Sequence, residues 1–285
     1  MTKSITVIGA GGQMGQWFTK YFADKGFQVT GYDEENKIKG KNIIQAESLV
    51  GAILKADYVI LCTPTRRTPE IIRLIAKEMK RGTYLIEISS EKGKVVSALS
   101  KIPAKINPIC IHPMFGPGVK NIKGQNIISV PVKDAKKELT VAKSLFEGAN
   151  FVTIDAVEHD KKIAVILGLT HLLNLVFANI ISKDEKFALA EKMSGTTFRV
   201  QKVLAESIMT ESPELIETII ANPEIRRVAE DLWKDVGRLL NAVQESKTEE
   251  VITYIKSCQE RLATKTDLDA SYKKLTKMVN AVEKK

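Results

Sequence analysis

Cysteine is scarce in this sequence, and no two cysteines are close enough to form a pair. The 285 residues include three, Cys62, Cys110 and Cys258, without a C-x-x-C spacing. This usage argues against a disulfide-stabilised scaffold and a cysteine-based metal site, and it fits a reducing compartment. We therefore expect a cytoplasmic protein without a bound metal. Residues 1–4 lead directly into a strand pattern, so we expect no signal peptide.

The sequence also lacks the compositional bias of disordered and fibrous proteins. Hydrophobic residues make up 44%, while glycine and proline number 17 and 9. Such a chain can build real hydrophobic cores. Its length fits one large or two ordinary domains.

No helix-turn-helix, zinc or aromatic–basic signature of nucleic-acid binding is present, so we expect no nucleic-acid partner. The formal net charge is nevertheless +9, and it is unevenly distributed. Residues 1–155 contain 23 basic and 14 acidic residues, whereas residues 156–285 contain 20 of each. This excess indicates either a solvated lysine-rich surface or a positive field that attracts an anionic dinucleotide and substrate.

Only one hydrophobic run, residues 163–181, approaches the length of a membrane span. Polar residues at 170, 171 and 174 interrupt its middle, and lysines flank both ends. We therefore predict a fully buried helix of a soluble protein and no membrane partner. Because the run is apolar on several faces, we also expect it to form a buried homodimer interface.

The first half of the chain alternates between strand-like and helix-like patterns. Strands are expected at 4–9, 27–32, 58–62, 83–88, 106–111 and 126–130, and helices at 16–25, 46–55, 69–80 and 135–147. Such alternation indicates βαβ units and an α/β domain with a parallel sheet of Rossmann type.

From residue 158 onward only helical patterns occur. They cover 158–182, 186–209, 213–220, 225–246 and 248–282. We therefore predict an α/β domain over 1–155 and an all-helical domain over 156–285.

A glycine-rich turn follows the first strand and opens a helix, as in a G-x-G-x-x-G dinucleotide site. Its glycines permit a tight turn and close approach to a pyrophosphate, which the helix N-terminus favours. The predicted cofactor-binding residues of this turn are Gly9, Gly11, Gly12, Gln13, Met14 and Gly15.

Asp33 ends the second strand, where a carboxylate can accept hydrogen bonds from the adenosine ribose. Glu34 and Glu35 follow, and no arginine is adjacent in the sequence. A 2′-phosphate would meet concentrated negative charge there, so we expect NAD rather than NADP. Thr63 and Pro64 follow the strand at 58–62 and complete the predicted cofactor site.

A histidine follows the apolar run at 109–111 and precedes a turn rich in proline and glycine. Because the usual pKa of histidine is about 6.5, His112 can act as a base near neutral pH. Ligands of open α/β sheets bind beyond the carboxyl ends of the strands. Ser90 also follows a strand, and it can hydrogen-bond both His112 and a substrate hydroxyl.

Several segments together resemble the prephenate dehydrogenase family, in matching order and approximate separation. They are Gly11–Gly15, Glu87–Lys92 as an acid-x-x-Ser-x-Lys motif, His112–Pro117, Glu158–Asp160, Leu169–His171 and Phe198–Val200. Glu87 stands where aspartate is common in the family. We interpret His159, in Glu158–Asp160, mainly as a structural or helix-capping residue.

The resemblance implies an NAD-dependent oxidative decarboxylation of prephenate to 4-hydroxyphenylpyruvate in tyrosine biosynthesis. In that reaction His112 takes the proton of the C4 hydroxyl as hydride leaves for the nicotinamide. Ser90 orients this pair as the second catalytic residue. His171 and Arg199 bind the substrate, and the arginine holds a carboxylate. The site is expected in a cleft between the two domains.

Other functions remain open. Arogenate dehydrogenase differs only in the substrate side chain, whose contact residue is not assignable. A 3-hydroxy acid dehydrogenase shares the domain plan but needs a catalytic lysine in the helical domain. A catalytically inactive NAD-sensing protein is opposed by the joint presence of Ser90, His112, His171 and Arg199.

Overall fold

The structure, a computed structural model, describes residues 2–40 and 43–283. The chain divides into two compact units, Met1–Ile163 and Ala164–Lys285. The predicted domain limit at residue 155 directly precedes helix α6 (Ala156–Ile163), which belongs to the first unit.

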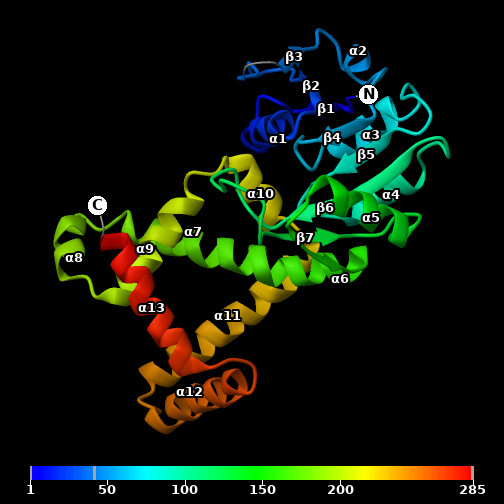
Figure 1. Ribbon diagram of the computed structural model, residues 1–285. Helices are drawn as coiled ribbons and strands as arrows, with labels where there is room; N and C mark the ends of the chain where they lie inside the picture. Colours follow the sequence, from blue (N-terminus) through cyan, green and yellow to red (C-terminus); the bar gives the residue numbers. More distant parts are fainter. Residues whose placement is uncertain (1, 41–42, 284–285) are drawn as a thin grey trace. The chain divides into compact units, whose positions relative to one another are not determined.

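The first unit is built on an eight-stranded sheet of order β3-β2-β1-β4-β5-β6-β7-β8 (Figure 1). The strands are β1 (Ser4–Ile8), β2 (Gln28–Tyr32), β3 (Ile43–Gln45), β4 (Tyr58–Leu61), β5 (Tyr84–Glu87), β6 (Asn107–Pro113), β7 (Asn126–Ser129) and β8 (Asn150–Thr153). All neighbours pair in parallel except β6 and β7, which are antiparallel. The expected α/β class is confirmed, with a sheet that is mostly parallel.

Hydrophobic residues on both faces of the sheet create two cores. Side chains alternate along a strand, so Val59 and Leu61 of β4 join one cluster while Tyr58 and Ile60 join the other. The helices of this unit are α1 (Gln13–Asp24), α2 (Leu49–Ile53), α3 (Thr68–Ile75), α4 (Gly93–Ser100), α5 (Ala135–Leu145) and α6.

Three short elements of the first unit were not predicted from the sequence patterns. Strands β3 and β8 lie at the two edges of the sheet and are largely exposed, so they lack a hydrophobic run. Helix α4 has eight residues and buries only Val95, Ala98 and Leu99. Elements this short carry too few apolar residues to establish a period.

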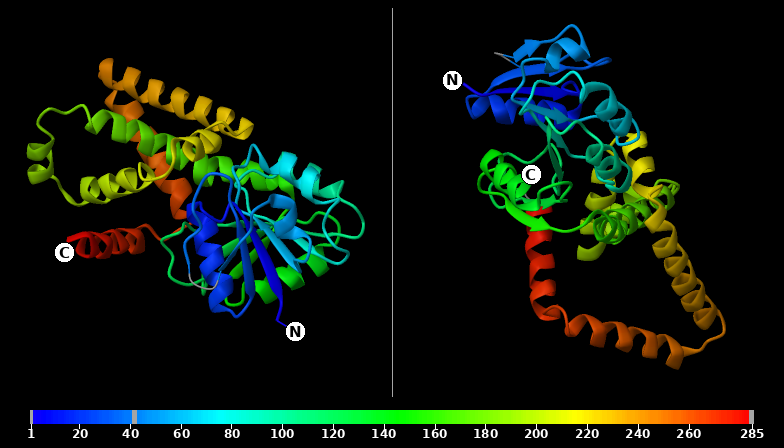
Figure 2. Two further views of the ribbon diagram at one scale, coloured as in Figure 1. Left: turned by 90° about the horizontal axis from the view of Figure 1, so that it is seen from above. Right: turned by 90° about the vertical axis from the view of Figure 1, so that its right-hand side faces the viewer.

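The second unit is built of helices joined by short turns, with no strand among its described residues (Figure 2). Its elements are the π-helix η1 (Ala164–Leu169) and the α-helices α7 (Thr170–Ile181), α8 (Phe187–Met193), α9 (Thr196–Ile208), α10 (Pro213–Ile220), α11 (Pro223–Gln244), α12 (Thr248–Ala263) and α13 (Leu268–Glu283).

Two predicted long helices are each divided in two. The helix predicted at 186–209 breaks at Ser194 and Gly195, where the glycine is the extended N-cap of α9. In the helix predicted at 248–282, α12 ends at Ala263. Asp267 precedes α13 and accepts the backbone N–H of Ala270. Both breaks follow from local capping, which the hydrophobic period does not report.

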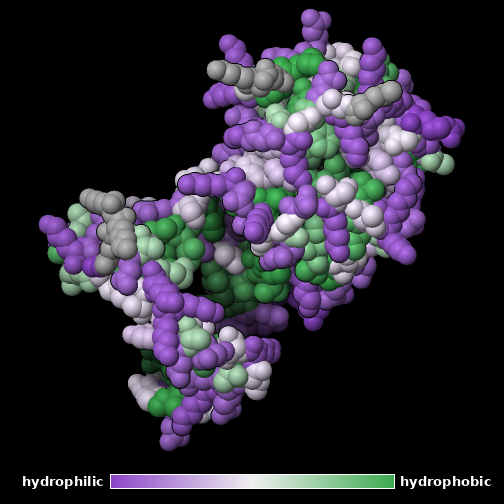
Figure 3. Space-filling model, viewed as in Figure 1, coloured by the Kyte–Doolittle hydropathy of each residue, from purple (hydrophilic) through white to green (hydrophobic). Residues whose placement is uncertain are grey.

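Helix Ala156–Ile181 is long and apolar enough to cross a membrane by length and composition alone, a test that core helices of soluble proteins also pass. Only 28% of its apolar window is buried, so the prediction of a fully buried helix is wrong for the single chain. Val176 and Ile180 are 49% and 63% exposed. Hydrophobic side chains also reach the surface elsewhere, as Figure 3 shows in green.

Candidate active site

The direction of strand order reverses between β1 and β4, and this is where open α/β sheets bind ligands. Gly9 follows β1 with a positive φ of 80°. A Cβ at this position would lie 2.4 Å from the carbonyl oxygen of Cys62, the residue after β4. Only glycine permits this close approach, which brings the glycine-rich turn beside the loop that carries Thr63.

The N-terminus of α1 has the features of a pyrophosphate site. Gly12 is its extended N-cap and supplies no side-chain cap. A Cβ on Gly15 would lie 1.9 Å from the carbonyl oxygen of Gly9, so the turn and the helix are packed as closely as backbone allows. The helix therefore presents uncapped N–H groups and its dipole to an anion.

Asp33 lies directly after β2, as expected for a ribose-binding carboxylate. Oδ2 accepts the N–H of Gly11 at 2.9 Å, and Oδ1 accepts those of Glu35 and Asn36 at 3.0 and 2.7 Å. Partial burial acts to raise the pKa of Asp33, but these backbone hydrogen bonds outweigh it and lower the pKa. The ionised carboxylate thus joins the turns that follow β1 and β2, and its Oδ2 retains a lone pair for a ribose hydroxyl.

An arginine lies near this acidic turn even though none is adjacent in the sequence. Nη2 of Arg67, in the loop after β4, lies 3.0 Å from Oε2 of Glu34. Both side chains are about half exposed, so the pair adds little stability. Sequence reasoning missed this contact because it joins residues 33 positions apart.

Thr63 and Pro64 form the connection into α3. The Thr63 hydroxyl lies 2.9 Å from that of Thr68, which also donates to the carbonyl of Pro64 at 3.1 Å. These contacts hold the loop after β4 in a fixed turn. The cofactor contacts of both residues stay predictions.

His112 lies within β6 rather than after it. The strand pairs in parallel with β5 up to Cys110, then continues antiparallel to β7, with His112 opposite Ile128. The side chain is 6% exposed. Burial, followed by the nearby Lys92 and His159, holds the pKa of His112 well below its usual value. His112 is therefore neutral at pH 7, as a proton acceptor must be.

His159 and Asp160 of α6 extend inward from His112 as a hydrogen-bonded chain. His112 Nδ1 lies 3.0 Å from His159 Nε2, and His159 Nδ1 lies 2.8 Å from Asp160 Oδ1. The expected capping role of His159 is wrong, because Asp155 accepts the first N–H groups of α6. Sequence reasoning missed this chain, for which the adjacent histidine and aspartate were the available signal.

A buried ion pair contacts strand β6 next to His112. Lys92 Nζ donates to Glu87 Oε2 and to the carbonyl oxygen of Ile111, each at 2.7 Å. Lys92 and Glu87 are both fully buried. A buried charge is tolerated when it is paired and hydrogen-bonded, and here the pair fixes the backbone immediately before His112.

The turn after His112 is fixed against α1. Trp17 Nε1 donates to the carbonyl oxygen of Val119 at 2.7 Å, and its ring lies 5.1 Å from that of Phe115. The aromatic residues that mark α1 in the sequence thus hold the proline- and glycine-rich segment as well as the core.

Ser90 is half-buried after β5. In the part of the chain that the structure describes, no hydrogen bond joins it to His112, whose Nδ1 is bonded to His159 instead. The catalytic role of Ser90 stays a prediction.

His171 lies in the first turn of α7 in the second unit, directly after the π-helix. Its Nδ1 lies 2.7 Å from the carbonyl oxygen of Leu167, and its Nε2 lies 3.3 Å from Glu211 Oε2. The hydrogen bond to Glu211 raises the pKa of His171 against the opposing effect of burial. π-helical turns often occur at functional sites, yet the substrate contact of His171 stays a prediction.

Arg199 lies in the first turn of α9. Its Nε donates to the Ser194 hydroxyl at 3.2 Å. The side chain is half-buried and belongs, like His171, to the second unit. Its role in binding a carboxylate stays a prediction.

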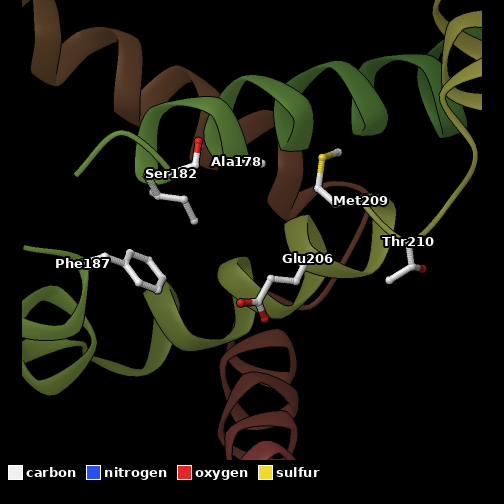
Figure 4. A pocket seen from close by; sticks show the side chains of 7 residues that line it. Ala178, Ser182, Phe187, Glu206, Met209 and Thr210 are labelled. Carbon is white, nitrogen blue, oxygen red and sulfur yellow. The ribbon is translucent and has the colours of Figure 1, made fainter. Parts of the chain in front are cut away.

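A cavity of about 440 Å³ also lies within the second unit, between α7, α8 and α9. Figure 4 shows Phe187, Glu206 and Met209 around it. No predicted site residue lines it. Over residues 2–40 and 43–283, no group of three metal-ligating side chains is present either.

Family models match most of the chain. Residues 18–155 match the nucleotide-binding domain of prephenate dehydrogenase, and residues 155–257 match its dimerization domain. Among curated relatives, a probable arogenate/prephenate dehydrogenase of Methanocaldococcus jannaschii is 32% identical over 142 residues, 47% of this chain. The T-protein of Enterobacter agglomerans is 27% identical over 127 residues, 44% of the chain. The chain spans 31% of the length of each relative.

Solved structures share the fold over nearly the whole chain. Prephenate dehydrogenase of A. aeolicus, in complex with hydroxyphenyl propionate and NAD+, superposes with a TM-score of 0.72 at 20% identity, covering 93% of this chain and 98% of that one. Synechocystis arogenate dehydrogenase gives 0.66 at 15% identity, covering 92% and 100%. Two consecutive family domains, joined at residue 155, place this chain in the prephenate dehydrogenase family.

Proposed function

We propose that the protein is an NAD-dependent prephenate dehydrogenase that forms 4-hydroxyphenylpyruvate, carbon dioxide and NADH. The observation that carries this proposal is a buried histidine with a lowered pKa on β6, in the same sheet as β1 and the dinucleotide-binding turn that follows it. Removal of a proton and a hydride from one secondary alcohol needs a base and a nicotinamide close to the same carbon atom.

His112 is the base of the proposed reaction. It takes the proton of the C4 hydroxyl while the carbon–hydrogen bond electrons leave as hydride. Loss of the ring carboxylate as carbon dioxide then returns the electron pair to the ring, which becomes aromatic, and the ring oxygen regains its proton from protonated His112. Aromatisation makes the step effectively irreversible, so the protein's tasks are proton removal and orientation. Ser90 is proposed to orient the hydroxyl.

NAD supplies the hydride acceptor when it is bound. The residues present fit it, since Gly9 and Gly15 permit the tight turn into α1 and Gly12 leaves room for a pyrophosphate at the N-terminus of that helix. The lowered pKa of Asp33 favours its carboxylate form, which would accept hydrogen bonds from ribose hydroxyls. A 2′-phosphate would meet Asp33 and Glu34, and the latter already neutralises Arg67. We therefore propose NAD as the preferred cofactor.

Arg199 and His171 are proposed to bind the substrate. A guanidinium can hold a carboxylate through two parallel hydrogen bonds. His171 carries a raised pKa, which favours a positive charge toward an anionic substrate. Prephenate carries two carboxylates, so cationic groups match its charge.

We propose a homodimer, in the reducing cytoplasm, as the functional form. Only 28% of the apolar window of helix Ala156–Ile181 is buried, and residues 155–257 match a dimerization domain. A second copy would remove these side chains from water, which is the driving force of association.

An absorbance assay for NADH with purified full-length chain tests the function. Prephenate and arogenate would each be supplied with NAD and with NADP. Turnover of prephenate with NAD is the expected result. Turnover of arogenate alone would keep the mechanism and change the substrate, while NAD binding without either turnover would favour a 3-hydroxy acid dehydrogenase or a sensor.

A further inference from the structure

His112 Nδ1 contacts Nε2 of His159, and His159 Nδ1 in turn contacts the carboxylate of Asp160. His159 is 1% exposed and Asp160 is 9% exposed, so water competes little for their hydrogen bonds. We propose that His159 and Asp160 are a positioning dyad that holds His112 in the tautomer with an unprotonated Nε2. The identification of Nε2 as the atom that takes the substrate proton rests on the proposed function.

The chain of hydrogen bonds has a direction because Asp160 only accepts. Its Oδ1 accepts the N–H of Lys92 and its Oδ2 accepts that of Gly93, both at 2.9 Å. These donors lie at the N-terminus of α4, where Lys92 supplies no side-chain cap and the helix dipole favours a negative charge. Asp160 is therefore a fixed acceptor.

The nitrogen that carries the hydrogen in each histidine then follows from the group to which it is hydrogen-bonded. Asp160 accepts from His159 Nδ1, so this nitrogen carries the hydrogen. In neutral His159, Nε2 has only a lone pair, and His112 Nδ1 must donate to it. A neutral histidine carries one hydrogen, which leaves His112 Nε2 bare and available as a base.

The same contacts persist when His112 gains a proton. Its Nδ1–H continues to donate to His159, and the carboxylate of Asp160 lies one ring further along the chain. Lys92 is the opposing charge near His112, and its Nζ is paired with Glu87. The dyad thus orients the base and offsets part of the charge that the reaction creates, as the aspartate does in a Ser-His-Asp triad.

Nitrogen-15 NMR of the resting protein tests the tautomers without any substrate. The chain has only three histidines, so single variants assign every ring. We expect neutral His112 and His159 both to carry hydrogen on Nδ1. A His112 ring protonated on Nε2, or a cationic His159 beside it at pH 7, would overturn the proposal. This result is independent of whether prephenate is the substrate.

Asp160→Asn tests the consequence for catalysis. The new amide can donate to His159 Nδ1, which reverses the chain and places the His112 hydrogen on Nε2. We expect kcat to fall about 100-fold or more, within the usual contribution of general base catalysis, while the Kd of NAD stays within about twofold. Asp134→Asn, which alters the N-cap carboxylate of α5, is the matched control and should retain kcat.

A second pair of variants separates positioning from packing. His159→Gln can place a carbonyl oxygen where Nε2 was and accept from His112, whereas His159→Leu has a similar size and no acceptor. We expect kcat of the glutamine variant to be about tenfold higher than that of the leucine variant. The glutamine variant should also keep the native His112 tautomer. Equal kcat in both folded variants, or an unchanged tautomer in the leucine variant, would assign His159 a packing role only.

Discussion

Two buried histidines differ because of what surrounds each ring. Burial dominates at His112 and lowers its pKa, whereas the hydrogen bond to Glu211 dominates at His171 and raises its pKa. A lowered histidine pKa means that the unfolded chain binds more protons below about pH 6.5, so this group's contribution to stability falls as the pH falls. His171 stabilises the fold at low pH, and its contribution is lost as the pH rises through its folded pKa.

Proton NMR should show this contrast directly. As the pH falls, His171 should take its proton above pH 6.5 and His112 well below it. Glu211→Gln removes the charged partner and should move the His171 midpoint down while leaving His112 unchanged. Equal midpoints for the two rings would contradict the environments described for them.

His112→Asn should abolish most turnover because the side chain that accepts the proton is gone. We expect kcat to fall about 100- to 10,000-fold, the usual range for general base catalysis. Calorimetric binding of NAD should change little, because His112 lies in β6 and not in the glycine-rich turn that follows β1. Unchanged turnover would remove His112 from the reaction.

Arg199→Gln should weaken substrate binding more than the chemical step. Loss of a charge-assisted pair costs about 1.5–3 kcal/mol, so KM for prephenate should rise about 10- to 100-fold. Arg226→Gln is the matched control, because Arg226 is an exposed arginine of the same unit paired with Glu230. If both variants keep the parent KM, the carboxylate is bound elsewhere.

Among the elements, the first turn and α1 are the most tightly constrained. A Cβ on Gly15 would overlap the Gly9 carbonyl, whereas a Cβ on Gly12 would lie 3.5 Å from it in ordinary contact. The two glycines therefore serve different purposes. Gly15 allows the helix to pack on the strand, and Gly12 leaves space outside the helix N-terminus.

Alanine variants should separate these purposes. Gly15→Ala should destabilise the unit by about 1–3 kcal/mol through overpacking, seen as a lower midpoint in denaturant. Gly12→Ala should keep that midpoint and bind NAD at least tenfold more weakly, because its methyl group occupies the approach to the pyrophosphate. Gly116→Ala, where nothing lies within 4 Å, should alter neither.

At the scale of the molecule, the single chain leaves much of its most apolar helix in contact with water. Leu173, Val176 and Ile180 of α7 are 45%, 49% and 63% exposed. Exposed apolar surface of this kind marks an interaction site. A second copy of the chain is the proposed partner.

Sedimentation velocity should show a dimer for the parent chain and a monomer for the double variant Val176→Glu, Ile180→Glu. Each glutamate would place a charge in the apolar contact. Leu74→Glu alters an equally exposed leucine of α3, 58% exposed, and should stay dimeric. Binding of the parent chain to lipid vesicles in place of dimerisation would point to a membrane partner.

The sequence by itself determined the α/β class, the helical second half and the positions of the glycine-rich turn, Asp33 and His112. These depend on local periodicity and on residues whose chemistry is specific at short range, as the confirmed elements around Gly9–Gly15 illustrate. It did not reveal strands β3 and β8, because three or four exposed residues carry no period.

Only the tertiary structure decided which polar groups meet. The His112–His159 contact spans 47 positions and the Asp160 contact with Lys92 spans 68. No sequence pattern encodes such pairs, because their geometry follows from how β6, α4 and α6 pack. How much of the apolar helix its own chain leaves uncovered also came only from the structure, because the same hydrophobic run serves equally for a core and for a surface that a partner covers.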